Sequence, residues 1–176
     1  MKSLISLPGV AFLILALAAP ALRADTELLN NGHFNSGKDG WHLDNIEGAK
    51  GDFTVETATD GTSSAHVTVP EAASVPYHVQ LFQDKLELKA GQTYHLSFRA
   101  RANASINIGL NAMIAETPWT SLWKQDVSLT SDWQTYAFDI TPTTSTTNGR
   151  VTFSRLAAQP ADYWFADVSL TAAAAK

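Results

Sequence analysis

The chain has 176 residues, a formal net charge of −5 and no cysteine. This length suffices for one domain with its own core, and the lack of cysteine excludes a disulfide-stabilised scaffold. The acidic balance argues against nucleic acid or an anionic lipid surface as the partner.

Residues 1–24 have the pattern of a secretory signal peptide. Lys2 provides a positive start, Val10–Ala19 is an apolar run, and small residues up to Ala24 offer cleavage sites. A membrane anchor is the alternative, but the apolar run is short for a bilayer span. We therefore expect a secreted protein, extracellular or periplasmic, that starts near Asp25 and does not insert into a membrane once the signal is removed.

After this segment, the sequence alternates with a period of two residues, which predicts β-strands with one face in a core. The alternation is strictest in Tyr94–Arg101. The predicted strands include Val55, His66–Val69, Tyr77–Gln83, Tyr94–Arg101, Ser105–Asn111, Gln134–Ile140, Val151–Phe153 and Tyr163–Leu170.

Turn-forming residues separate these strands at Asp60-Gly61, Gly91, Ser131-Asp132 and Asn148-Gly149. Thr141–Thr147 is rich in threonine and is expected to form a long surface loop. Many short strands at regular spacing predict an all-β domain, either a sandwich or a barrel. We expect one domain over residues 25–171, followed by a frayed tail at 172–176.

The outward positions of three predicted strands carry amide, guanidinium, imidazole and aromatic groups. Amides donate and accept hydrogen bonds as hydroxyl groups require, and aromatic rings cover the apolar faces of sugars. A plain solvated sheet face is the alternative. The pattern favours a surface for a neutral polyhydroxylated ligand, formed by His78, Gln80, Phe82, His95, Arg99, Asn107 and Asn111.

A second candidate group lies in the loop-like segment Glu116–Lys124, which holds Trp119 and Trp123. Loops on a rigid scaffold often carry binding residues. Because burial of tryptophan is favourable, an exposed tryptophan needs a functional reason. We expect one of the two to be buried and the other to be available to a ligand.

The titratable residues form no recognisable catalytic pattern. The carboxylates are scattered, whereas a glycosidase needs two that face one cleft. The five histidines lack the spacing of metal ligands, and no G-x-S-x-G nucleophile motif is present. We therefore expect no catalytic residue.

Three motifs occur in the order found in one known family. They are Leu29–Asn35 followed by Gly40-Trp41, the run Val79–Ala102, and Tyr163–Leu170. Together they resemble the family 4/9 carbohydrate-binding modules. The resemblance implies a jelly-roll β-sandwich of two antiparallel sheets that binds β-glucan or xylan-type polysaccharide in a concave groove. Such modules accompany glycoside hydrolases and catalyse nothing themselves. By position, Tyr77 corresponds to an aromatic of the groove.

The resemblance also implies a structural calcium ion near the first and last strands. The positions of this chain that match its ligands are Asn35 and Asp167, but an acidic residue of the family is replaced by Asn35 and another by Ala166. Calcium prefers several oxygen ligands, carboxylates among them. Calcium at Asn35 and Asp167 is therefore an expectation that the sequence supports only in part.

These observations favour a secreted, non-catalytic domain that binds polysaccharide and assists a separate glycoside hydrolase. Two other functions stay open at this point. One is a small secreted glycosidase or polysaccharide lyase on the same fold, with His95, Arg99 and Arg101 at a uronate. The other is an adhesin-like envelope module that binds a protein through Trp119 and Trp123.

Overall fold

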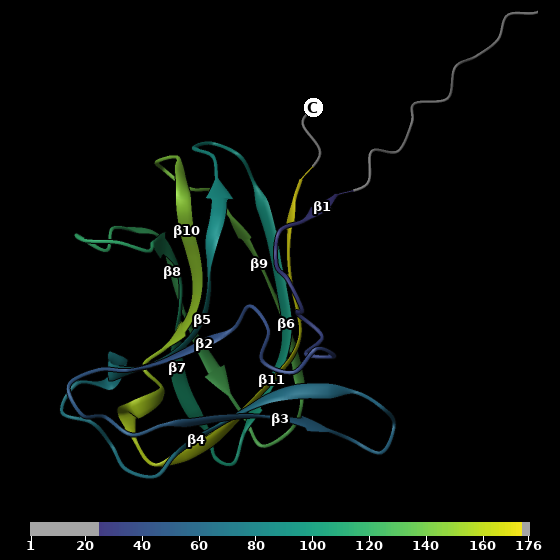
Figure 1. Cartoon of the computed structure of the whole chain (residues 1–176), viewed down its shortest axis with the longest axis vertical. Helices are drawn as coiled ribbons and strands as arrows, with labels where there is room; N and C mark the ends of the chain where they lie inside the picture. The colour runs from purple at the N-terminus through teal and green to yellow at the C-terminus, as the bar shows by residue number, and fades with distance from the viewer. Residues whose placement is uncertain (1–24, 174–176) are drawn as a thin grey trace, which may run out of the picture.

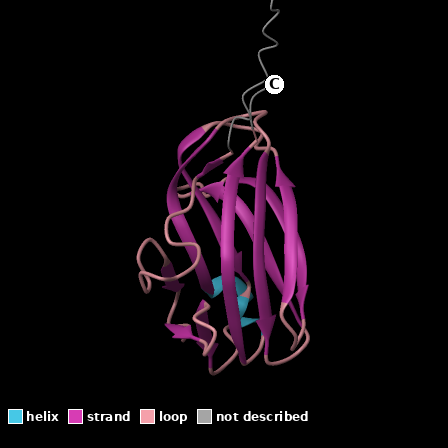
Figure 2. Cartoon of the chain, turned by 90° about the vertical axis from the view of Figure 1, so that its right-hand side faces the viewer, coloured by secondary structure: helices cyan, strands magenta, loops and turns pink. Residues whose placement is uncertain are grey.

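A computed structural model describes residues 25–173; the predicted signal peptide and residues 174–176 lie outside the described residues. The described chain forms two packed sheets and two short 3-10 helices (Figures 1 and 2). The elements are β1 (Thr26–Glu27), β2 (His42–Asn45), β3 (Asp52–Thr57), β4 (Ser63–Val69), η1 (Pro76–His78), β5 (Val79–Leu88), β6 (Tyr94–Ala102), β7 (Ile106–Ile114), β8 (Ser121–Leu129), β9 (Gln134–Ile140), β10 (Thr146–Ser154), η2 (Leu156–Ala158) and β11 (Ala161–Ala172).

We name each sheet after its central strand. The β11 sheet has the order β3-β4-β11-β6-β9, with β1 paired to β11, and the β10 sheet has the order β2-β5-β10-β7-β8. Neighbouring strands run antiparallel in both sheets. Figure 1 shows the two layers edge on, and Figure 2 turns the side with β6, β9 and β11 toward the viewer. The predicted all-β jelly-roll sandwich is confirmed.

The core lies between the sheets and consists of the inward side chains of the alternating strands. Leu96 and Phe98 of β6 are each 1% exposed, as the alternation of Tyr94–Arg101 predicts. Phe153 of β10 stacks on Phe165 of β11 with ring centroids 4.2 Å apart, and Phe98 meets Phe153 edge-on at 5.0 Å. These aromatic contacts join the centres of the two sheets.

Three segments differ from the prediction. Asn148-Gly149 forms no turn but lies inside β10, where Gly149 pairs with Leu86 and Ile114. A Cβ at Gly149 would lie 2.8 Å from Leu88 Cδ1, so the glycine permits close packing. The loop expected over Thr141–Thr147 ends earlier, because Thr146 begins β10. Strand β8 begins at Ser121, so only the first part of Glu116–Lys124 is a loop.

The end of the described chain is well anchored. Strand β11 runs through Ala172, one residue past the predicted end of the domain, and the amide of Ala173 donates to Thr93 O at 3.0 Å. Gln92 Nε2 donates to Ala173 O at 2.8 Å. Across residues 25–173, we find no helix whose length and apolar content would allow it to span a bilayer.

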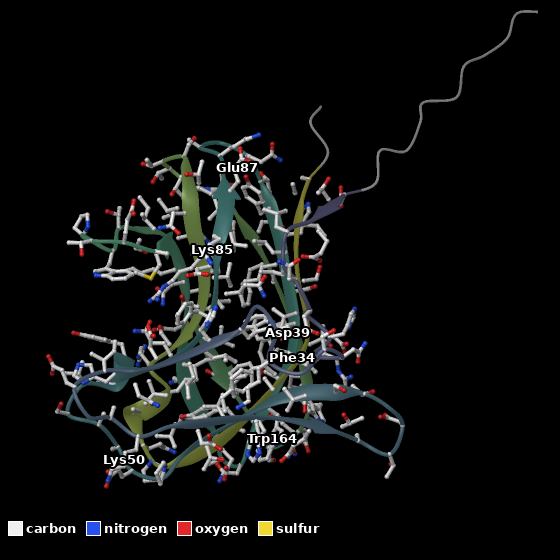
Figure 3. All side chains as sticks on the ribbon, in the orientation of Figure 1. Phe34, Asp39, Lys50, Lys85, Glu87 and Trp164 are labelled. Atoms are coloured by element: carbon white, nitrogen blue, oxygen red, sulfur yellow. The ribbon has the colours of Figure 1, made fainter. Side chains whose placement is uncertain are left out.

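The opening and closing sequence motifs meet at the edge of the sandwich. The amide of Val168 donates to Gly32 O at 3.0 Å, and Trp41 Nε1 donates to Asn31 O at 3.3 Å. Phe34 is 1% exposed and packs on Trp41 with ring centroids 5.2 Å apart. Figure 3 labels Phe34 and Asp39 on the segment between β1 and β2. These motifs therefore close one end of the core.

Candidate functional site

A cleft of about 680 Å³ crosses the outer face of the β10 sheet. Every strand of that sheet or the segment next to it contributes to the lining. The volume falls in the range of sites that hold small ligands. The lining residues are Asp44, Ile46, Tyr77, Gln80, Asn111, Met113, Trp119, Ser121, Arg150, Ser154 and Arg155.

Two exposed aromatic side chains form the rim of this cleft. Among the described residues, Tyr77 and Trp119 are the large hydrophobic side chains that stay exposed, at 53% and 49%. Tyr77 comes from η1 before β5, and Trp119 comes from the segment between β7 and β8. The β5 and β7–β8 sides of the sheet lie on opposite sides of β10. An aromatic group therefore flanks the cleft on each side.

The floor of the cleft is built around Arg150 of β10, which is only 5% exposed. Its Nη2 donates to Gln80 Oε1 at 3.0 Å, and its Nη1 lies 3.5 Å from Asp44 Oδ2. The guanidinium carbon lies 4.5 Å from the centre of the Phe82 ring and 5.2 Å from that of Trp119. The planar cation thus lies within cation–π distance of two aromatic rings and donates a hydrogen bond to Gln80.

The electrostatics of this floor combine burial with partial compensation. Burial lowers the pKa of Arg150, and the nearby carboxylates of Asp44 and Asp84 oppose that change. Arginine nevertheless stays charged at any ordinary pH. Arg150 Nε and Thr152 Oγ1 are buried without a hydrogen-bond partner. Both atoms are shielded by the chain itself, and Thr152 is not among the residues that line the cleft.

Hydroxyl and amide groups continue the floor beside Arg150. Asn111 Nδ2 donates to Ser154 Oγ at 2.9 Å, and Ser154 Oγ donates to Gly109 O at 3.2 Å. These bonds fix the position of the Asn111 amide. A polar floor beneath an aromatic rim matches a ligand that carries both hydroxyl groups and apolar C–H faces.

The structure brings part of the predicted site together. Tyr77, Gln80, Asn111 and Trp119 line the cleft. Phe82 does not line the cleft itself, but its ring centre lies 4.5 Å from the guanidinium carbon of Arg150. Asn107 also belongs to β7, but it lines a separate hollow further along the strand.

The prediction that His95 and Arg99 share this face is wrong, because β6 belongs to the other sheet. His95 Nδ1 contacts Asp139 Oδ1 at 2.6 Å, and Arg99 Nη1 contacts Asp167 Oδ2 at 3.3 Å. Alternation shows which side chains leave the core but does not show which sheet they leave it from. Trp164, another outer residue of that sheet, lies beside strands β3 and β4 in Figure 3.

His78 and Trp123 also lie away from the cleft. The sequence predicts His78 on the outward face of a strand. This prediction is wrong, because His78 ends η1 and is only 3% exposed. Its Nε2 lies 3.7 Å from Glu47 Oε2. Trp123 packs on Phe138 with ring centroids 5.8 Å apart, while Trp119 is exposed. Trp123 is only partly buried, so the expectation of one buried tryptophan holds in part, and the availability of Trp119 to a ligand stays a prediction.

Sequence reasoning missed the charged residues of the cleft, namely Asp44, Arg150 and Arg155. Arg150 alternates with the core residues Val151 and Phe153, but the neighbouring Asn148-Gly149 indicated a turn. Strand β2, which carries Asp44, has only four residues and no clear alternation. The one sequence signal for Arg150 is the alternation of the polar residues Arg150 and Thr152 with the core residue Val151 between them.

The residues implied for calcium do not form a fitting donor set. Both carboxylate oxygens of Asp167 face nitrogen atoms, with His33 Nδ1 at 2.8 Å and Arg99 Nη1 at 3.3 Å. Calcium requires about six to eight oxygen ligands and is repelled by a guanidinium. Across residues 25–173, no three His, Cys, Asp or Glu side chains gather to hold a metal ion. Asn35 and Asp167 therefore do not fit the ion.

Comparison with known proteins gives one family match. The family model of a carbohydrate binding domain that covers families 4 and 9 matches residues 26–158. No curated protein matches the chain by sequence.

Several solved structures are similar in fold. A CBM4 structure is 28% identical and covers 82% of this chain and 99% of its own, with a TM-score of 0.73. The N-terminal cellulose-binding domain of Cellulomonas fimi β-1,4-glucanase C is 21% identical and covers 84% of this chain and 98% of its own, with a TM-score of 0.63. The second N-terminal cellulose-binding domain of that enzyme is 21% identical, with a TM-score of 0.66. The match covers 88% of this chain and 99% of that domain.

Proposed function

Because this chain belongs to the carbohydrate binding domain family of the family 4 and 9 modules, we propose that it is secreted and binds a β-glucan or xylan-type polysaccharide in the cleft of the β10 sheet. One observation carries the choice of this cleft. The two exposed large hydrophobic side chains of the described chain, Tyr77 and Trp119, line the same cavity.

The domain is a non-catalytic binding domain, as its family and its structural neighbours indicate. The cleft agrees with this, because Asp44 is the one carboxylate among its described lining residues. Glycoside hydrolysis commonly uses a pair of carboxylates across the scissile bond. In our proposal the domain holds a polysaccharide at which a separate glycoside hydrolase acts.

The ligand class follows from the chemistry of the floor and rim. Arg150, Gln80 and Asn111 offer donors and acceptors to hydroxyl groups, and the aromatic rings of Tyr77 and Trp119 cover C–H faces. The charges of Arg150 and Asp44 lie 3.5 Å apart and offset each other. This balance favours a neutral sugar chain over a polyanion. The cellulose-binding names of two structural neighbours support the same class.

Affinity electrophoresis and titration calorimetry with soluble β-glucans and xylans test the proposal. We expect retention of the unmodified protein by at least one of these polysaccharides. Trp119→Ala should weaken binding roughly tenfold, because a stacked ring contributes about 1–1.5 kcal/mol.

The matched control is Trp133→Ala, which removes a tryptophan that contacts Arg99 and Arg101 on the β11 sheet. It should leave the affinity unchanged. If the unmodified protein is retained by no polysaccharide, the proposed function is wrong. If Trp133→Ala alone weakens retention, the binding face is wrong.

A further inference from the structure

A second hollow of about 440 Å³ lies beside the main cleft. It is formed where β7 begins, where β8 ends and where the chain leaves η2. Its polar lining includes the amides of Asn107 and Gln159 and the hydroxyls of Ser128 and Thr130. Ser128 Oγ donates to Asn107 Oδ1 at 2.6 Å, which fixes the Asn107 amide. The hollow thus offers the same kinds of group as the floor of the cleft.

Arg155 lines both the cleft and the second hollow. It follows β10 with a left-handed backbone, φ 62° and ψ 27°, which turns the chain out of the sheet. Its Nη1 donates to Asp126 Oδ1 of β8 at 2.9 Å. The Arg155 side chain therefore spans from the end of β10 to β8, and it borders both cavities.

Gly109 of β7 makes room for this crossing side chain. Gly109 pairs with Ser154 on one side and with Asp126 on the other. A Cβ at this position would lie 2.6 Å from Ser154 Oγ and 3.2 Å from Arg155 Cδ. The absence of a side chain at Gly109 lets the methylene groups of Arg155 lie over β7.

The ion pair that holds Arg155 between the two cavities is weak. The Arg155 and Asp126 side chains are 42% and 76% exposed. An ion pair with this exposure contributes only about 0–1 kcal/mol, because water screens it and two flexible side chains must be ordered. A ligand that forms hydrogen bonds of its own can therefore move the Arg155 side chain aside or accept hydrogen bonds from it.

The two cavities differ in direction. The main cleft crosses the strands from β2 to β8, whereas the hollow is displaced along β7, from Asn111 toward Asn107. This displacement is roughly 13 Å at the rise of a β-strand. A linear chain that lies across the strands passes beside the hollow, while a substituent that points along the strands reaches it.

From this geometry we infer that the second hollow is a subsite for a neutral sugar branch on the polysaccharide bound in the main cleft, with Arg155 at the branch point. The inference rests on the proposed function and adds a preference for a branched ligand. The charge of Arg155 is offset by Asp126, so a neutral pentose or hexose suits the hollow better than a uronate.

Calorimetry with paired oligosaccharides tests the inference. The probes are a linear xylo-oligosaccharide and one with a single arabinofuranosyl branch on an equal backbone, and a linear cello-oligosaccharide and one with a single xylosyl branch. In at least one pair, the unmodified protein should bind the branched member about fivefold more tightly, the effect of one or two further hydrogen bonds.

Variants assign this preference to the hollow. The double variant Asn107→Ala/Gln159→Ala should bind the branched and the linear member equally, with the linear affinity unchanged. Gln134→Ala, an exposed glutamine at the start of β9 in the other sheet, is the matched control and should keep the preference.

Equal binding of linear and branched members by the unmodified protein would overturn the inference while the proposed function stands. So would an equal loss for both members in the double variant. In a further titration, the free branch monosaccharide is added after the protein is saturated with the linear member. Binding heat in this titration would show an independent sugar site and would also contradict the branch assignment. Binding of no oligosaccharide at all would instead reject the proposed function.

Discussion

Arg150 and Trp119 are in contact across the cleft, with the guanidinium carbon 5.2 Å from the centre of the indole ring. The buried cation holds one face of a tryptophan whose side chain is otherwise 49% exposed. Phe82 supports the guanidinium at 4.5 Å. The guanidinium thus lies near both rings, and the Trp119 ring at the rim offers an aromatic surface on which a sugar ring can pack.

Arg150→Lys should weaken polysaccharide binding about tenfold in titration calorimetry. Lysine keeps the charge but lacks the planar guanidinium, which lies near the rings of Phe82 and Trp119 and donates to Gln80. Because arginine stays protonated, the affinity of the unmodified protein should be constant from about pH 6 to 9. Arg99→Lys, in the other sheet, should bind as the unmodified protein does. Equal losses for both variants would contradict the role of Arg150.

Gly32→Ala should destabilise the fold by about 3 kcal/mol or more, measured by urea unfolding. A Cβ at Gly32 would lie 1.8 Å from Val168 O, so the opening and closing motifs could not stay in contact. Gly37→Ala is the control, since a Cβ there meets nothing within 4 Å. Its φ of 64° is left-handed, so we expect a cost of about 1 kcal/mol. Similar costs at both sites would refute this account of Gly32.

Alkaline pH should destabilise the protein partly through Tyr163. Its buried hydroxyl donates to Leu156 O at 2.7 Å, and burial raises its pKa far above the ordinary value of 10. Above pH 10 the unfolded chain loses this proton while the folded chain keeps it, so the free energy of unfolding falls as pH rises.

The variant Tyr163→Phe should lose about 1 kcal/mol at neutral pH and show a shallower decline of stability above pH 10. Tyr136→Phe is the comparison, because burial also raises the pKa of Tyr136 but its side chain is only partly buried. Thermal unfolding at a series of pH values measures both. An unchanged alkaline decline in Tyr163→Phe would exclude this residue as a cause.

Calcium should leave the melting temperature unchanged. The Asp167 carboxylate already contacts His33 and Arg99, and a bound ion would have to displace a guanidinium. Thermal scans with calcium and with a chelator check this. A rise in melting temperature that saturates with calcium would show that the ion binds the folded chain and would contradict this prediction.

The strands could be predicted from the sequence because their alternation is imposed by one buried face. Leu96 and Phe98 are predicted inward and are buried, as are Ile108 and Leu110 of β7. The assignment of strands to sheets could not be predicted in this way. Sheet pairing depends on contacts between distant segments, so the polar positions of β6 and β7 look alike although they face opposite sides of the molecule.

The cleft could be predicted in part: alternation places Gln80 and Asn111 on outward positions, and two aromatic residues carry signals of their own. Trp119 stands out as an aromatic residue in a predicted loop, Tyr77 corresponds by position to a groove aromatic of the resembled family, and both line the cleft. Arg150 follows Asn148-Gly149, a pair that is typical of turns and therefore hid the strand. In the structure this pair lies inside β10, where the glycine is needed because a side chain at position 149 would clash with Leu88. Local turn preference and tertiary packing favour the same residue here, and only the structure separates them.

Chemical-shift mapping by NMR tests the central claim most directly. On titration with a polysaccharide fragment that the protein retains, the backbone amides of Gln80, Asn111 and Arg150 and the indole of Trp119 should shift, while those of His95 and Arg99 in β6 stay in place. Shifts concentrated on β6 and β11 with an unperturbed β10 sheet would contradict the account.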